Sequence, residues 1–565
     1  METVCKKSWI TIGTMGLMVL FCVLRIILGN LMGIIFDPDA SVDDALLVQY
    51  AYLPTHFHVP WAYSLVKTMS FPLFLDAVYV LGISYQTGMA LLYFASALLF
   101  FFLVRKISGK QWAALLVFIY ILFLPAGFEY SYSFRLYRNG LIVPAVLLVA
   151  GLSLHALFDI IIRKEYTKKQ LLEVVLFGIA SVFAIYIKED GAWITAVLLF
   201  VCALLTGFSV WRGIQEKKTN KAWAFSLLIA LIPCLLFGFS TLGYKAVNKH
   251  YFGVAEIETR NSGELGRFVS LVYEIESENR DASVWAPTDV VEKAFEASPT
   301  LAGLPGFRES VWHSVYFSDI DEAPMTGDFL TWVVRWALTE NDLFTTEKEV
   351  DELFGKINAE LEAAFRNGTL QKDTRFRPFS ASAGKTAEEV LQLVPRTFKA
   401  VQLSVTLQNY LPGGEPPESK LRDENRGLME FAAMLTHTGE ILTDEQLFTR
   451  RLAVGCIRIL FVVYRWINIL FFVIAAGSFI ALTVLLIRKP EFRKKEALFL
   501  QGSVFSTAGI MLLYAFCICW FASFLEGDYS IQFYTPAIPS LLAVIYSLSW
   551  CSLSGIFANR LLHRK

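Results

Sequence analysis

Four carboxylates lie within eight residues near the start of the chain, directly after a long apolar run. They are Asp37, Asp39, Asp43 and Asp44. The apolar run, residues 9–29, is long enough to cross a bilayer, since a helix rises about 1.5 Å per residue and the hydrocarbon layer is about 30 Å thick. The acids are therefore expected at a membrane surface, where a carboxylate could take a proton from a bound hydroxyl. The alternative is an N-terminal cap, in which Ser41 or Asp43 accepts hydrogen bonds from the free amides that open a helix at 45–53, where acids are also favoured.

Basic residues are expected on the same side of the membrane. Arg135 and Arg138 are three residues apart just before an apolar run, so their guanidinium groups could form a fork around phosphate oxygens. Lys67 lies in an otherwise apolar stretch and could make a second phosphate contact. The alternative is that these side chains reach out to lipid headgroups. Basic residues on the outer side run against the usual export bias, and an anionic ligand is the simplest explanation for them.

A short charged loop adds to the candidate site. Lys188, Glu189 and Asp190 lie between two apolar runs. Lys188 could bind phosphate, while Glu189 and Asp190 could orient a substrate or hold Mg²⁺ or Mn²⁺, which prefer oxygen ligands. The alternative is a solvated hairpin tip. Candidate cavity-lining residues are Tyr137, Tyr529, Gln532 and Tyr534. Two prolines follow the last three of these, and irregular backbone at membrane depth is tolerated where it lines a cavity.

The candidate residues must be positioned by the elements of a membrane protein, as the composition indicates. Of 565 residues, 55% are hydrophobic and 18% charged, against roughly 45–50% and 25% in soluble domains. The apolar runs predict an all-α fold with about ten transmembrane helices, at about 9–29, 84–104, 111–127, 140–162, 171–187, 192–210, 222–246, 455–487, 497–523 and 531–553. Prolines break residues 30–83, which predicts a large external loop with short helices along the interface at about 45–53 and 61–81.

The charges of the connecting loops predict the orientation. Loops expected inside carry clusters of Lys and Arg, and short loops expected outside are acidic or mixed. We therefore expect a multi-pass protein of the plasma membrane with both termini in the cytoplasm. Three parts follow: a transmembrane module at 1–247 with a catalytic loop at 30–83, an extracytoplasmic soluble α-helical domain at 248–451, and the last three helices within 452–565.

Several classes of function lack support in the sequence. The net charge of -1 provides no basic surface for nucleic acid. The eight cysteines lie in or beside apolar runs, and residues 248–451 contain none, which excludes a disulfide-stapled domain there. Motifs typical of zinc peptidases, P-loop ATPases, serine lipases and dinucleotide-binding enzymes are absent from the sequence.

With these motifs in this order, the chain resembles the glycosyltransferase C superfamily, the integral membrane transferases that use polyprenyl-phosphate-linked sugars. The resemblance rests on an apolar helix followed by Asp43 and Asp44 in a large external loop, on the basic loop before residue 140, and on a late external domain. It covers about residues 9–250 and, loosely, the last three helices. The order of motifs looks most like that of uncharacterised bacterial multi-span proteins of this class, whereas residues 248–451 match no catalytic or sugar-binding domain.

The superfamily implies a lipid-phosphate sugar donor, an active site outside the cytoplasm and an aspartate of the first loop as general base. In O-mannosyltransferases the acidic pair is Asp-Glu, whereas here it is Asp-Asp, so either aspartate could be the base. We expect Asp43, with Asp44 as the substitute, to take the proton of an acceptor hydroxyl. The cations Lys67, Arg135, Arg138 and Lys188 would stabilise the leaving polyprenyl phosphate. Direct displacement at the anomeric carbon would invert its configuration.

The expected activity is transfer of a hexose or pentose to an extracytoplasmic glycan, lipid or protein of the cell envelope. A transporter or flippase for lipid-linked saccharides would need the same phosphate-binding rim, but also ionisable groups along a path through the membrane. Apart from residues near the span ends, such as Arg25 and Lys245, the predicted spans lack them. A non-enzymatic envelope scaffold is the third possibility. The transferase requires Asp43 or Asp44 close to two of the cations, in a cleft that lipid can reach.

Overall fold

The computed structural model describes residues 2–36, 42–59, 61–165, 167–215, 221–314, 325–412, 426–438, 444–488, 494–525 and 527–557. Asp37 and Asp39 lie outside these ranges. Within them the chain is almost entirely helical, and the strands are the short antiparallel pair β1 (Val284–Ala286) and β2 (Met325–Thr326). The prediction of an all-α membrane protein is confirmed.

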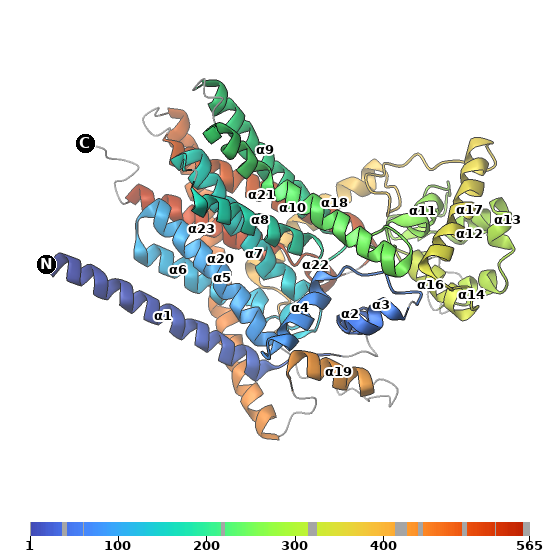
Figure 1. The fold of residues 1–565 in the computed structure, drawn as a ribbon, viewed down its shortest axis with the longest axis horizontal. Helices are drawn as coiled ribbons and strands as arrows, with labels where there is room; N and C mark the ends of the chain where they lie inside the picture. The colour runs from blue at the N-terminus through green and yellow to red at the C-terminus, as the bar shows by residue number, and fades with distance from the viewer. Residues whose placement is uncertain are drawn as a thin grey trace.

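Long helices form a bundle on one side of the molecule (Figure 1). They are α1 (Glu2–Met32), α5 (Tyr85–Ser108), α6 (Gln111–Leu122), α7 (Arg138–Leu157), α8 (Lys168–Ile185), α9 (Ala192–Gln215), α10 (Lys221–Phe252), α20 (Asp444–Arg488), α21 (Lys495–Phe521) and α23 (Ile538–Phe557). The short turns η1 (Pro125–Phe128) and η3 (Phe158–Arg163) extend α6 and α7, and η2 (Tyr130–Phe134) precedes α7.

The number of spans differs slightly from the predicted ten. By length and composition, 8 described helices could cross a membrane, and a ninth is the pair α22 (Asp528–Tyr534) and α23, bent by 71°. The remaining predicted span, 171–187, forms as α8 and packs against α7 and α10. Because Lys168, Lys169 and Glu173 lie in its first two turns, α8 is not among these eight, although it runs back along α7 to the loop where Glu189 contacts Arg138.

The first loop contains three short helices, α2 (Val42–Ala51), α3 (Leu53–His58) and α4 (Ser70–Val80). The second predicted interfacial helix, 61–81, is helical only over α4, and residues 61–69 form turns. The hydroxyl of Tyr50 supplies hydrogen bonds to these turns: it donates to the Tyr63 carbonyl and accepts from the Val66 amide at 3.0 Å. A buried turn is stable only when its backbone groups are paired in this way.

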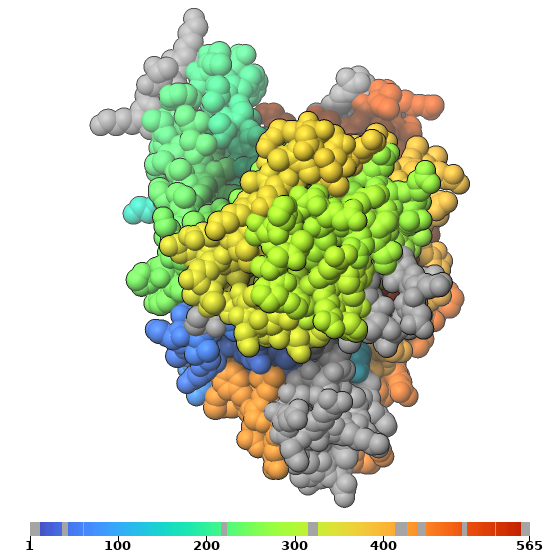
Figure 2. Space-filling view, turned by 90° about the vertical axis from the view of Figure 1, so that its right-hand side faces the viewer, coloured from blue at the N-terminus to red at the C-terminus, as the bar shows by residue number. Residues whose placement is uncertain are grey.

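A lobe lies at one end of the bundle, which we call the lobe end (Figures 1 and 2). Its helices are α11 (Gly263–Val272), α12 (Thr288–Ala297), α13 (Pro299–Ala302), α14 (Phe307–His313), α16 (Leu330–Glu340) and α17 (Glu347–Arg366). The lobe has its own hydrophobic core, which includes Trp285 and Phe354. It is fixed to the first loop, because the Thr259 amide donates to the Leu65 carbonyl at 2.7 Å and Arg335 donates to the Ala62 carbonyl.

The rest of the predicted external domain packs differently. Buried residues of α18 (Ala387–Thr406) and α19 (Arg426–Thr436) belong to the core of the bundle, not to that of the lobe. The segment predicted as one soluble domain, 248–451, therefore contains parts that pack into two separate cores.

Gly140 sets a close approach between the start of α7 and the preceding loop. A Cβ atom there would lie 2.0 Å from the carbonyl oxygen of Tyr132. We expect Gly140→Ala to lower the free energy of unfolding in detergent by about 3 kcal/mol, since backbone cannot move aside cheaply. Gly13→Ala in α1 is the matched control, because nothing lies within 4 Å of its Cβ position. That substitution should be neutral or stabilising by about 0.5–1 kcal/mol, and equal losses in both variants would contradict the interpretation.

Candidate functional site

Asp43 lies at the lobe end among basic groups that come from distant parts of the chain. Its Oδ1 is 2.8 Å from the Nζ of Lys67, and its Oδ2 is 3.7 Å from the Nη2 of Arg138. The hydroxyl of Tyr137 donates to the same Oδ2 at 3.3 Å. The side chain of Asp43 is 28% exposed, whereas those of Lys67 and Arg138 are buried. One accessible carboxylate thus faces two buried cations, and neither of these cations extends into lipid.

The neighbouring Asp44 has a different environment. It is buried and accepts two hydrogen bonds from Arg135, at 2.8 Å from Nε and 2.9 Å from Nη2. The Arg135 guanidinium lies over the ring of Tyr137 at 4.7 Å and over that of Phe533 at 5.2 Å. The helix α2 begins at Val42, so both aspartates lie inside its first turn, where acids are favoured, and Asp43 is not its N-cap. The other predicted cap, Ser41, lies outside the described residues. Both aspartates also contact cations. The helix start and the charge cluster therefore use the same residues.

Arg138 is the first residue of α7 and forms a second, fully buried pair. Its Nη1 lies 2.5 Å and 2.7 Å from the two carboxylate oxygens of Glu189. A fork of Arg135 and Arg138 around phosphate oxygens stays a prediction, and in this structure the two side chains pair with different acids. Arg135 precedes the helix while Arg138 begins it, so the two guanidinium groups turn to different acids. Burial by itself would raise the pKa of Glu189, but the charges of Arg138 and Lys67 bring that pKa down to about 2.

The other residues of the 188–190 loop pair with each other. The Nζ of Lys188 is 3.6 Å from the Oδ2 of Asp190 and lies 5.4 Å from the ring centre of Tyr534. The loop is tight because a Cβ on Gly191 would lie 2.1 Å from the Ile185 carbonyl oxygen. Glu189 and Asp190 are thus each engaged by a cation, and a Mg²⁺ or Mn²⁺ ion held by them stays a prediction.

The lobe contributes a cation that sequence reasoning missed. Arg260 forms an ion pair with Asp328, and its guanidinium lies 5.6 Å from the ring centre of Trp332. The Nζ of Lys67 lies over the same ring at 4.7 Å. Since the charge of Arg260 lowers the pKa values of both Asp43 and Glu189, it belongs to the same electrostatic cluster. No motif surrounds Arg260, and only the docking of the lobe brings it to the first loop.

Burial and neighbouring charges shift the pKa values of several groups in this cluster. Burial would raise the pKa of Asp43, but Lys67, Arg138 and Arg260 together hold it well below its usual value. Burial lowers the pKa of Lys67 to about 8, although Asp43 opposes this shift. Glu258, which accepts from the amides of Arg260 and Asn261 at 2.7 and 2.9 Å, has its pKa raised to about 7 by burial and by the charge of Glu189.

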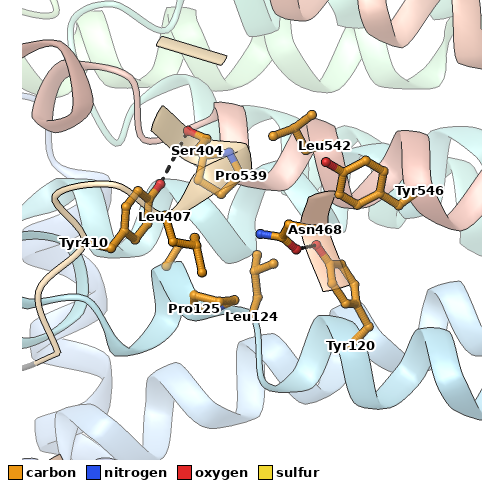
Figure 3. Close-up of a pocket in the computed structure, with 11 residues that line it drawn as sticks. Tyr120, Leu124, Pro125, Ser404, Leu407, Tyr410, Asn468, Pro539, Leu542 and Tyr546 are labelled. Atoms are coloured by element: carbon orange, nitrogen blue, oxygen red, sulfur yellow. Dashed lines mark hydrogen bonds between the residues drawn. The ribbon is translucent and has the colours of Figure 1, made fainter. Parts of the chain in front are cut away.

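The predicted cavity-lining residues have individual places. Tyr137 contacts Asp43, and Tyr534 lies beneath Lys188. Tyr529 shares a hydrogen bond with Ser131 at 2.6 Å. Gln532 is buried, and its side-chain amide has no partner among the described residues. None of the four lines the small cavity of Figure 3, which lies between α6, α18, α20 and α23 and is lined by Tyr120, Asn468 and Tyr546 among others.

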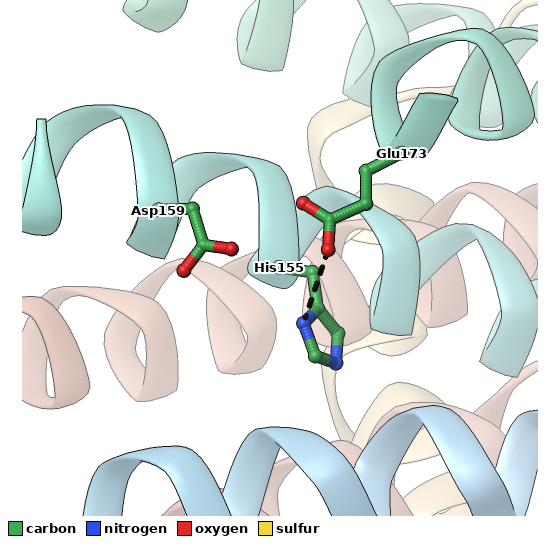
Figure 4. Close-up of side chains that lie close together, drawn as sticks. All are labelled: His155, Asp159 and Glu173. Carbon is green, nitrogen blue, oxygen red and sulfur yellow. Dashed lines mark ion pairs between the residues drawn. The ribbon is translucent and has the colours of Figure 1, made fainter. Parts of the chain in front are cut away.

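A second charged cluster lies on α5, α7, η3 and α8. His155, Asp159 and Glu173 are the three described ligand-type residues whose atoms come within 4.8 Å of one another (Figure 4). The Nζ of Lys106 already lies among them, at 2.8 and 2.9 Å from the oxygens of Asp159 and 3.2 Å from the Nδ1 of His155. An ammonium group in this position supplies the positive charge that the acids require, so the cluster is a buried ion-pair network.

Comparisons with known proteins add little to this description of the site. No family model matches the chain, and no curated protein matches it. Among solved structures, it is similar to ArnT from Cupriavidus metallidurans bound to undecaprenyl phosphate, with 12% sequence identity, a TM-score of 0.27, and coverage of 97% of this chain and 78% of that chain. So loose a superposition assigns no role to any residue. The chain is an all-α, multi-span membrane protein.

Proposed function

We propose that this chain is a membrane glycosyltransferase that moves a sugar from a polyprenyl-phosphate donor to an acceptor hydroxyl outside the cytoplasm, with inversion at the anomeric carbon. The observation that supports this best is the contact of Asp43 with Lys67, Arg138 and Tyr137 at the lobe end of the bundle. A carboxylate beside preplaced cations is what such a transfer needs: a proton acceptor for the attacking hydroxyl and positive charge for the leaving phosphate.

The two aspartates take different roles in this proposal. Asp44 uses both of its oxygens to hold Arg135, and it is buried. Asp43 is partly exposed: its Oδ1 contacts Lys67 at 2.8 Å, whereas its Oδ2 makes longer contacts with Arg138 and Tyr137, at 3.7 and 3.3 Å. An acceptor hydroxyl can therefore reach Asp43 without breaking a two-pronged ion pair. We assign the general base to Asp43 and make Asp44 a positioning residue for Arg135.

Donor binding would also adjust the strength of the base. A carboxylate whose pKa lies well below neutrality is a weak proton acceptor. In the structure Lys67 and Arg138 hold the pKa of Asp43 low. A donor phosphate that takes over these cations would compete with Asp43 for them, and the pKa of Asp43 would then rise towards the working pH. Arg260, which reaches the cluster from the lobe, would share the charge of the same phosphate, while Arg135 and Lys188 border the site.

The proposal is tested by measuring sugar transfer with purified protein in lipid nanodiscs. Polyprenyl phosphates carrying single hexoses or pentoses serve as donors, with cell-envelope extracts as the source of acceptors. Transfer with inverted anomeric configuration, determined by NMR of the isolated product, is the expected result. Movement of a labelled donor across proteoliposomes without cleavage of its glycosidic bond would instead establish a transporter, and the transferase proposal would be abandoned.

The pKa of Lys67 predicts a pH limit for donor binding. Its value of about 8 lies below that of a free lysine, so Lys67 loses its charge in the folded protein as the pH rises through 8. We expect the KM for the donor to rise about tenfold per pH unit above this point, because one charge on the phosphate then lacks its partner. In Lys67→Arg the guanidinium stays protonated, and the rise should be absent up to about pH 10. A donor KM with the same pH profile in both proteins would remove Lys67 from the phosphate site.

A further inference from the structure

The C-terminal half of α18 is packed inside the membrane bundle. Its residue Ser404 and the following Leu407 and Tyr410 line the cavity that also contains Tyr120 and Tyr546 (Figure 3). Tyr120 lies on α6, which with η1 could cross a membrane, and Tyr546 lies on α23, which belongs to the bent pair α22 and α23. Tyr546 is 8 residues after the start of α23 at Ile538, which corresponds to about 12 Å along the helix. The end of α18 therefore reaches well below the lobe end of the bundle.

The middle of α18 is fixed at the end of α21. The guanidinium of Arg396 donates to the carbonyls of Ala522, Ser523 and Leu525 at 3.3, 3.1 and 2.7 Å. These are carbonyl groups of the kind that a helix end leaves without intrahelical partners. One turn further on, Lys399 pairs with Asp528 at 3.1 Å. From this level α18 continues for two turns into the bundle, where Ala400, Val401 and Leu403 join its core.

The opposite face of α18 is apolar and exposed. Leu391, Val394 and Phe398 are 69%, 41% and 60% exposed, and their spacing places them on one side of the helix. We call Leu391, Val394 and Phe398 the α18 apolar face. Outside α18, Phe376 is 64% exposed, and its ring centre lies 5.9 Å from that of Trp520 near the end of α21. Polar residues border the α18 apolar face, with Glu388 before and Gln402 after it on the same side.

We infer that the α18 apolar face contacts the lipid bilayer, so that α18 is an amphipathic helix embedded in the membrane surface instead of part of a soluble domain. The helix α18 packs against α21, whose own exposed residues Phe505 and Leu513 belong to a helix that could cross the membrane. Basic groups at the level of Arg396 and Lys399, with apolar side chains on the opposite face, are the arrangement of an interfacial helix. This inference does not depend on the proposed transferase activity.

Photocrosslinking to lipid tests the inference. A diazirine-bearing apolar amino acid is placed at Leu391 or at Phe398 in the full chain, which is reconstituted into vesicles of phosphatidylcholine and phosphatidylglycerol. Leu513 on α21 is the lipid-facing control, and the exposed Lys356 on α17, in the lobe away from the bundle, is the water-facing control (Figure 1). We expect about tenfold more lipid adduct at Leu391 and Phe398 than at Lys356, since apolar side chains of interfacial helices are buried at the acyl boundary.

Two outcomes would overturn the inference. One is a lipid yield at Leu391 and Phe398 equal to that at Lys356, while Leu513 still forms adducts. The other is a crosslink from Leu391 or Phe398 to a second copy of the chain or to another protein in place of lipid. Because these positions are exposed already, an apolar photoreactive side chain should leave folding unchanged, and an unaltered unfolding midpoint verifies this for each labelled protein.

Discussion

Asp43→Asn lowers the turnover number for sugar transfer by about 10²–10⁴-fold in our expectation, because an amide cannot take the proton of the acceptor hydroxyl. The amide is nearly isosteric and leaves Lys67 and Arg138 within reach of an oxygen, so donor binding should change less than turnover. The measurement is kcat and KM for the donor in the same nanodisc assay. Asp43→Glu keeps a carboxylate and should recover part of the activity, although the longer side chain shifts its position.

Asp44→Asn is the matched comparison, one residue away on the same helix. It should weaken the two-pronged contact with Arg135, at 2.8 and 2.9 Å, and act mainly through the position of Arg135. We therefore expect a smaller loss of kcat than in Asp43→Asn. If Asp43→Asn keeps full turnover while Asp44→Asn loses it, the base is Asp44. If both variants fold and turn over like the wild type, neither aspartate is the base.

Arg138→Met should lower the free energy of unfolding by about 3–5 kcal/mol, because it leaves Glu189 charged and buried without its partner. The side chains of Arg138 and Glu189 are 1% and 6% exposed, so water cannot compensate the lost contact. Asp43 retains Lys67 in this variant, and the effect is therefore specific to Glu189. The measurement is chemical unfolding in detergent, followed by circular dichroism.

A double variant and a surface pair serve as controls for this prediction. Arg138→Met combined with Glu189→Gln removes the unpaired charge and should be more stable than Arg138→Met alone, with a coupling of up to about 3 kcal/mol. Arg308→Met breaks the exposed pair with Glu292 on the lobe, 51% and 36% exposed, and should cost about 0–1 kcal/mol. Additive effects of Arg138→Met and Glu189→Gln would show that the two residues do not depend on each other.

The lobe and the first loop both contribute side chains to the electrostatic cluster. Arg260 and Trp332 come from the lobe, whereas Asp43 and Lys67 come from the first loop. The pairing of Arg260 with Asp328 fixes the guanidinium next to Trp332. The lobe therefore adds an ion pair, Arg260 with Asp328, to the candidate site.

Much of the secondary structure was predictable because its signals are local. The span predicted at 84–104 forms as α5, Tyr85–Ser108, with Ser84 as its N-cap and Gly109 in the left-handed conformation at its end, φ 69°. Both are helix-end signals that can be read from neighbouring residues. The spans at 111–127, 140–162 and 192–210 likewise coincide with helices, since each apolar run must satisfy its own backbone hydrogen bonds within a membrane.

The sequence by itself therefore determined that this is a helical membrane protein, and it determined which charged residues stand out against apolar surroundings, Asp43, Lys67 and Arg138 among them. The tertiary structure decided which of these side chains form ion pairs: Asp43 with Lys67, Asp44 with Arg135, and Arg138 with Glu189. It also decided that Arg260 joins them and that α18 enters the bundle. The physical reason is the distance along the chain over which each kind of signal acts. Helix periodicity and capping act within a few residues, whereas an ion pair between side chains 24 to 91 positions apart depends on how whole elements pack, which no local pattern encodes.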